Sequence, residues 1–259
     1  MRERVPVVVR RRGRSPLARV LWNGAELAVT LGVLLLLLVV HQLWWTNRQA
    51  RDGAERQVRE LEQQWEGGGG VDVPAGSRPE PSASGEEDDD SDTERRERSA
   101  SGTGPQRPRW DQAYAVLSIP RIGVRVPVAE GVSKGGVLDK GYVGHYPRTA
   151  QPGRPGNFAV AGHRNTHGEP FRYINRLRPG DRLDVATKGA VYTYAVDSSL
   201  AQTLPGDGGV IEPVPRSRVK PGAGYEERGY YLTLTTCTPE FTSKYRLVVW
   251  AKLKSVRPR

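Results

Sequence analysis

The sequence predicts an all-β domain, an eight-stranded β-barrel with short helices, which follows one N-terminal transmembrane helix and a disordered tether. Three observations support this prediction. An apolar run occupies residues 27–45, a segment rich in Ser, Pro, Gly and charge occupies residues 71–109, and short β-rich segments begin at Trp110. The expected boundaries are 1–19 for a basic cytoplasmic segment, 20–46 for the anchor, 47–109 for an extracellular flexible linker and 110–259 for the folded domain.

The anchor is predicted from residues 27–45, which read LAVTLGVLLLLLVVHQLWW. A helix of this length rises roughly 28 Å, about the thickness of a hydrocarbon core. Seven arginines in residues 1–19 place the N-terminus in the cytoplasm by the positive-inside rule, and Trp44 and Trp45 suit the interface. The alternative is a cleaved signal peptide, which has a shorter apolar region and a small-residue cleavage site. No Ala-x-Ala follows the span, so an uncleaved single-pass anchor is expected.

The linker is predicted from composition. Residues 47–66 are charged and can form a short helix, although Gly53 weakens that expectation, and four glycines at 67–70 end it. Residues 71–109 contain too little apolar surface to offset the entropy of ordering. The acidic run 86–90 is interpreted as a solvated stretch and not as a metal site.

The barrel is predicted from short strands that alternate with turns. Residues 113–120 and 122–128 surround a Pro-Arg turn, and residues 181–187 and 190–199 form a hairpin around a Lys-Gly turn. The remaining expected elements are strands at 157–163, 230–237 and 245–253, and a helical turn at 170–177. About eight short strands with little helix favour a closed or nearly closed barrel. The Gly/Pro-rich connection 201–229 is longer than topology needs, which suggests a functional loop.

The net charge of +10 is uneven along the chain. Residues 110–259 carry 22 basic and 12 acidic residues, so the folded domain is positive. A positive domain suits an anionic setting, such as a wall polymer, lipid headgroups or nucleic acid. The sequence contains no zinc-finger spacing, aromatic RNA-binding motif or basic helix, so nucleic acid is not an expected partner.

The chain contains one cysteine, Cys237, at the end of the β-branched run TLTTCTP. A single cysteine in an exported domain cannot form an internal disulfide. It is therefore either a buried apolar residue or a reactive thiol.

Two further residues favour the reactive alternative. His163 ends an apolar strand in AVAGHRN, where the preceding glycine permits close approach of another chain. Arg246 opens the last strand, nine residues after Cys237. Together these residues supply a nucleophile, a general acid/base and a fixed cation for an oxyanion. The alternative for Arg246 alone is a surface charge at a strand edge.

The motifs TLTTCTP and AGHRNTHGEPF, with the matched arginine, resemble those of sortases, the membrane-anchored cysteine transpeptidases of Gram-positive bacteria. The resemblance covers about residues 110–254 and is closest to class E, the housekeeping sortases of actinobacteria. It implies a sortase-type barrel and a catalytic domain outside the cell membrane. One cysteine and three scattered histidines in the domain show no metal-ligand spacing, so no metal is expected, and no cofactor is expected. The implied partners are sorting-signal peptides of surface proteins and a peptidoglycan or lipid II amine acceptor.

The resemblance also implies roles for individual residues. Cys237 would attack the Thr-Gly bond of an LAXTG or LPXTG sorting signal and form a thioacyl intermediate. His163 would protonate the departing amine and later deprotonate the incoming one, and Arg246 would hold the substrate and stabilise the oxyanion. Thr236 is a candidate for hydrogen bonding in the same site, or only a strand residue. Tyr146 is preferred over Tyr142 as the residue that reads the alanine of LAXTG.

Two other functions fit parts of the pattern. A cysteine hydrolase would need Cys237 but no amine acceptor, and a non-enzymatic wall-binding barrel would need neither. A pilus-building sortase often has a second, C-terminal membrane span, whereas this chain ends in KLKSVRPR, which favours the housekeeping role.

Overall fold

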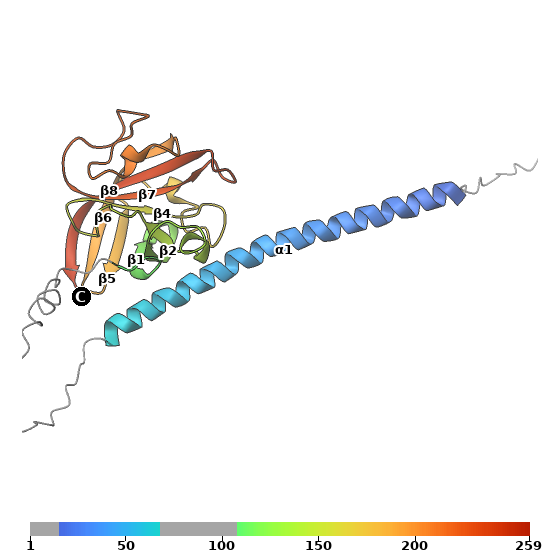
Figure 1. Cartoon of the computed structure of the whole chain (residues 1–259), viewed down its shortest axis with the longest axis horizontal. Helices are drawn as coiled ribbons and strands as arrows, with labels where there is room; N and C mark the ends of the chain where they lie inside the picture. The colour runs from blue at the N-terminus through green and yellow to red at the C-terminus, as the bar shows by residue number, and fades with distance from the viewer. Residues whose placement is uncertain (1–15, 68–107) are drawn as a thin grey trace, which may run out of the picture. The chain divides into compact units, whose positions relative to one another are not determined.

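The computed structural model of the chain describes residues 16–67 and 108–259 (Figure 1). Most of the expected basic segment, and the linker between residues 68 and 107 with its acidic run, lie outside the described residues. The described part forms two compact units, one that ends at Thr46 and one that begins at Asn47. Each unit is described by itself.

The first unit contains the apolar part of helix α1 (Pro16–Gly67). This helix is long and apolar enough to cross a membrane, with a mean hydropathy of 2.2 over its most apolar window. None of that window is buried, which distinguishes it from the core helix of a soluble domain.

The second unit is a closed barrel of eight strands in the order β1-β2-β3-β4-β7-β8-β6-β5. The strands are β1 (Ala113–Ile119), β2 (Val124–Glu130), β3 (Val143–His145), β4 (Gly156–Ala161), β5 (Arg182–Thr187), β6 (Ala190–Thr203), β7 (Tyr230–Thr238) and β8 (Tyr245–Pro258). The closed strand order confirms the predicted barrel, and the two predicted hairpins are present as the antiparallel pairs β1–β2 and β5–β6. The turn of the first hairpin contains Gly123 at φ 65°, a conformation that favours glycine.

β3 was not predicted from the sequence, because its three residues are too few to show a period of two. β3 pairs in parallel with β2 and antiparallel with β4, and so closes the barrel between them. The helical turn expected at 170–177 is present as a short 3₁₀ helix, η3 (Ile174–Arg176).

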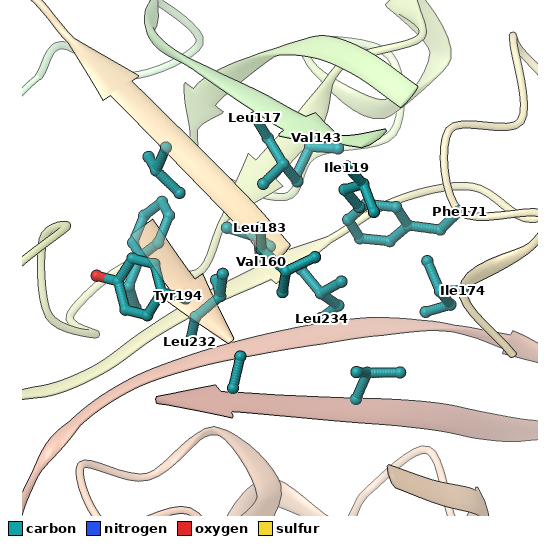
Figure 2. Packing of buried hydrophobic residues seen from close by; sticks show 14 of the residues in the cluster. Leu117, Ile119, Val143, Val160, Phe171, Ile174, Leu183, Tyr194, Leu232 and Leu234 are labelled. Atoms are coloured by element: carbon teal, nitrogen blue, oxygen red, sulfur yellow. The ribbon is translucent and has the colours of Figure 1, made fainter. Parts of the chain in front are cut away.

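The barrel core is formed by the inward side chains of the strands, together with Phe171 and Ile174 from the connection before β5 (Figure 2). Leu232 and Leu234 of β7 point into this core and are fully buried. Each buried side chain of this size contributes about 2 kcal/mol of transfer free energy. The alternate residues of β7 therefore face the outside of the barrel.

The second unit also includes residues 47–67 of α1, where the sequence analysis expected the start of a flexible linker. Ala50, Ala54, Val58 and Leu61 recur at helical spacing and are buried. Val58 and Leu61 join an apolar cluster with side chains of β1 and β2. This narrow apolar stripe is surrounded by charged residues, which dominate the composition of the segment and obscure it.

Candidate active site

Cys237 lies near the end of β7, on the outer face of the barrel. Leu234 points into the core, so the alternation of the strand places Thr235 and Cys237 on the opposite face. The Cys237 thiol is free and partly accessible to solvent. A half-exposed strand end gives this thiol access to an extended peptide.

Arg246 lies directly opposite Cys237 in the antiparallel pairing of β7 and β8. Directly opposed residues share a face, so the guanidinium and the thiol belong to the same surface. Nη1 of Arg246 donates to the carbonyl oxygens of Ser243 and Tyr245, both at 3.0 Å. Within the described residues Nε and Nη2 make no hydrogen bond, so they remain available to a bound peptide.

His163 follows β4, which runs parallel to β7. The last paired residues are Ala161 and Thr235, so His163 and Cys237 each lie two residues beyond this pair. The amide of Gly162 donates to the carbonyl of Thr235 at 3.2 Å and continues the contact between the two chains. The fold therefore brings the positions of Cys237, His163 and Arg246 together at one end of three adjacent strands.

Asp139 contacts the imidazole of His163 and was not identified from the sequence. Nε2 of His163 lies 2.8 Å from Oδ1 of Asp139, and Nδ1 of His167 lies 3.6 Å from the same oxygen. Burial lowers the pKa of His163, the Asp139 carboxylate opposes this by raising it, and His167 and Lys134 lower it further. Asp139 lies 24 residues before His163, with no motif that connects them, so no sequence signal indicated the contact.

The donor atoms of Asp139, His163 and His167 lie within 4.8 Å of one another, as in a metal site. Two ligands of a tetrahedral zinc ion are separated by about 3.3 Å, because each lies about 2.0 Å from the metal. The 2.8 Å between Asp139 and His163 is shorter and has the length of a charge-assisted hydrogen bond. We therefore interpret this contact as a hydrogen bond.

Two residues beside His163 shape the turn after β4. A Cβ atom on Gly162 would lie 2.7 Å from the ring of Phe171, so glycine is required there, as the sequence suggested. Arg164 is buried, and its Nη1 donates to the carbonyl of Cys237 at 3.2 Å and to Oγ1 of Thr238 at 2.8 Å. Arg164 therefore ties the chain after His163 to the chain at Cys237, a contact that the sequence analysis did not anticipate.

The two expected substrate-binding residues lie on different faces. Thr236 is buried, and its hydroxyl donates to the carbonyl of Gly162 at 2.8 Å, which fits its alternative as a strand residue. Tyr146 is half-buried, and its hydroxyl lies 3.1 Å from Oγ1 of Thr235, on the face that carries Cys237. Tyr142 instead contacts Gln57 of α1 at 3.2 Å, away from the thiol.

The long connection 201–229 is ordered by its own contacts. Asp207 is buried and accepts hydrogen bonds from the hydroxyls of Thr203 and Ser217, both at 2.5 Å, and from the amide of Arg218 at 2.9 Å. Burial raises the pKa of Asp207, but these hydrogen bonds outweigh it and lower the pKa below its ordinary value. Asp207 therefore acts as the centre of the loop and not as a cation ligand.

The chain is similar in sequence to a known protein family and to two curated proteins. Residues 117–254 match the sortase domain family. The chain is 42% identical to sortase SrtE1 of Streptomyces coelicolor over 255 residues, which covers 96% of this chain and 62% of that protein. It is 30% identical to sortase SrtE2 of the same organism over 237 residues, with coverage of 88% and 79%. The chain thus spans less than two-thirds of the length of SrtE1.

Solved structures agree with these relatives. The crystal structure of sortase E1 from Streptomyces coelicolor, with a tripeptide in its active site, matches with a TM-score of 0.55 and 50% identity. The match covers 59% of this chain and 94% of that chain. Sortase E from Streptomyces avermitilis matches with a TM-score of 0.51 and 43% identity, over 58% of this chain and 93% of that one. The similarity extends to class E sortases.

Proposed function

Because this chain belongs to the sortase family, we propose that it is a membrane-anchored class E cysteine transpeptidase. It cleaves the Thr-Gly bond of LAXTG- or LPXTG-type sorting signals and joins the threonine carboxyl to a peptidoglycan or lipid II amine. One observation supports this most strongly: Cys237 faces Arg246 across β7 and β8, and His163 lies two residues beyond the end of the neighbouring strand β4.

The reaction proceeds through two acyl transfers. The Cys237 thiolate, whose proton His163 has taken, attacks the threonine carbonyl carbon and forms a tetrahedral oxyanion, which the free N–H groups of Arg246 stabilise. His163 gives a proton to the glycine amine as the C–N bond breaks, which leaves a thioester on Cys237. An acceptor amine then attacks the thioester, His163 takes its proton, and the thiolate leaves. Atoms balance without a cofactor.

The location of this chemistry follows from the anchor. The arginines of residues 1–19 keep the N-terminus in the cytoplasm, residues 20–46 span the membrane, and the domain 110–259 lies outside the cell. In this position the domain meets both secreted surface proteins and the amines of the cell wall. Tyr146 is suited to read the second residue of the sorting signal, because its hydroxyl reaches Thr235, two residues before Cys237.

The test uses the full chain in detergent micelles, incubated with an LAXTG peptide, with and without an oligoglycine amine. Mass spectrometry follows the protein and the products. We expect an acyl adduct on Cys237 and a ligated peptide when the amine is present, and neither with Cys237→Ala. Cleavage without ligation to any amine tried would support a hydrolase, and no adduct with either LAXTG or LPXTG would contradict the proposal.

A further inference from the structure

The part of α1 next to the expected membrane span packs against the barrel through one apolar face. Ala50, Ala54, Val58 and Leu61 recur every three or four residues and are all buried, with Val58 only 1% exposed. Val58 and Leu61 contact a cluster of barrel side chains. These barrel residues are Ala113, Val116, Ala129 and Val137. A packed face of this kind fixes the helix on the barrel.

Two glycines allow this helix to lie directly on two loops. A Cβ atom on Gly141 would lie 2.9 Å from the carbonyl oxygen of Ala50, and one on Gly168 would lie 3.3 Å from Cγ of Arg51. Both glycines have positive φ, 80° and 82°, which other residues rarely adopt. Gly141 lies two residues after Asp139, so the helix touches the loop that carries that carboxylate.

Polar contacts attach the same helix to the second loop. Nδ2 of Asn47 donates to Oε1 of Glu169 at 2.9 Å, and Nη2 of Arg51 donates to Oε2 of Glu169 at 3.1 Å. Nε of Arg51 also donates to the carbonyl of Gly168 at 3.0 Å. The Glu169 side chain is only 5% exposed, so the carboxylate end of these charge-assisted hydrogen bonds is buried, whereas the Arg51 side chain is 57% exposed. His167 directly precedes Gly168 and Glu169, the two residues that the helix contacts.

On their other side the two loops hold the imidazole of His163. Oδ1 of Asp139, from the first loop, lies 2.8 Å from Nε2 of His163, and the ring of His167, from the second loop, lies 5.3 Å from the His163 ring between centroids. We propose that residues Asn47–Leu61 of α1 are a positioning element for the active site, which acts by holding the two loops that place Asp139 and His167 beside His163. This proposal rests on the proposed function of His163 and deepens it.

The contact has a chemical consequence. The charged groups that act on His163 are Asp139, which raises its pKa, and His167 and Lys134, which lower it. Transfer through Cys237 needs a thiolate beside an imidazolium. Where the thiol has the higher pKa, that ion pair becomes about tenfold rarer for each unit by which the histidine pKa falls. Asp139 therefore increases the active population against the effect of burial.

The experiment compares three variants of the full chain in lipid nanodiscs. Asp139→Asn keeps a hydrogen-bonding group but removes the charge, and Arg51→Ala removes the helix anchor. Arg59→Ala is the matched control, because Arg59 lies on the same helix and pairs only with Glu55 at the surface within the described residues. Each protein is assayed for peptide ligation across pH, and its histidines are labelled with ¹³C for titration by NMR. The chain has only four histidines, and His163→Gln assigns the signal.

We expect Asp139→Asn to reduce kcat/KM about tenfold and to lower the titration midpoint of His163 by about one unit. Arg51→Ala should reduce kcat several-fold with KM unchanged and move the midpoint by less than Asp139→Asn does. Arg59→Ala should stay within twofold of the natural protein. If Arg51→Ala fails to fold, Asn47→Ala, which removes hydrogen bonds alone, takes its place.

An unchanged His163 midpoint in Asp139→Asn would overturn the inference, as would equal behaviour of Arg51→Ala and Arg59→Ala. Loss of folded protein without a shifted midpoint would show a structural role only and would also overturn it. The NMR titration needs no turnover, so it separates this inference from the proposed function. A natural protein that titrates as expected but never ligates peptide would remove the proposed function and leave the contact established.

Discussion

The barrel contains two Gly-His dipeptides on neighbouring strands, residues 144–145 at the end of β3 and residues 162–163 just after β4. His145 is fully buried, and both its ring nitrogens are in contact with acceptor oxygens. Nδ1 lies 2.7 Å from Oε2 of Glu130, and Nε2 lies 3.1 Å from the carbonyl of Ala150. Every polar atom of this imidazole has a protein partner, so its role is to hold the structure.

His163 differs in each of these respects. Its side chain is 17% exposed, and only Nε2 has a hydrogen-bond partner among the described residues. The second ring nitrogen remains available to a substrate or a thiol. The same dipeptide thus has both imidazole nitrogens bonded within the protein at one position and one nitrogen left available at the other, which fits the catalytic role proposed for His163.

The largest loss of activity should come from changes to Cys237 and His163. Cys237→Ala and His163→Ala should each reduce ligation at least about 10³-fold, because they remove the nucleophile and the acid/base group. Their thermal unfolding midpoints should stay close to that of the natural protein, since neither side chain is part of the core. Peptide ligation and circular dichroism measure the two quantities. Retained turnover in Cys237→Ala would refute the mechanism.

Changes to Arg246 test the proposed stabilisation of the oxyanion. Arg246→Ala should lower kcat/KM about 10²-fold, the usual cost of a lost oxyanion donor. Arg246→Lys should recover little, because an ammonium group cannot both hold the two carbonyls of the strand end and point separate N–H groups at a substrate. Steady-state kinetics would decide this, and a lysine variant with natural activity would show that charge alone suffices.

The structural histidine should behave in the opposite way. His145→Ala should lower the free energy of unfolding by about 2 kcal/mol, because it leaves Glu130 without its partner and opens a cavity beside Phe158. The activity per folded molecule should stay within about threefold. Urea unfolding combined with active-site titration of Cys237 measures both. A His145→Ala variant that is stable but inactive would contradict the structural role assigned to His145.

Tyr146 is expected to affect selectivity more than rate. Replacing it with alanine should change the ratio of kcat/KM for LAXTG and LPXTG peptides by about tenfold, the range available to a single side-chain contact. Competition between the two peptides in one reaction gives the ratio directly. The control is Tyr142→Phe, which loses only a hydroxyl that contacts α1. An unchanged ratio would remove Tyr146 from the site.

The smallest effect concerns the long loop and depends on pH. The pKa of Asp207 is lowered in the folded state, so its contribution to stability is present above the ordinary value of 3.8 and is lost as the pH falls through the lowered pKa. Asp207→Asn should therefore cost about 1 kcal/mol near neutral pH and progressively less in acid. Unfolding curves at several pH values would test this, and a cost independent of pH would contradict it.

The sequence was sufficient to predict the barrel, and the three residues that it proposed for the site lie at neighbouring positions in the structure, but it did not indicate the residues that contact them. Strand periodicity and turn residues predicted the two hairpins, which the structure confirms. Asp139 and Arg164 meet His163 and Cys237 through loop geometry, which depends on tertiary contacts and leaves no local pattern. The apolar stripe of residues 50–61 was visible in principle, since its helical spacing is regular, but the charged residues around it dominated the composition.

The apolar stripe of residues 50–61 also determines where a recombinant fragment of the protein should begin. The cluster of Val116, Ala129 and Val137 on the barrel is covered by Val58 and Leu61 of the helix. A recombinant fragment that begins at Trp110 would present this cluster to water and would invite aggregation during purification. A fragment that begins at Asn47 keeps the whole folding unit together while it leaves out the apolar span. The place to separate the folded unit from the apolar segment is thus within helix α1, at Asn47, and not in the Ser/Pro-rich linker.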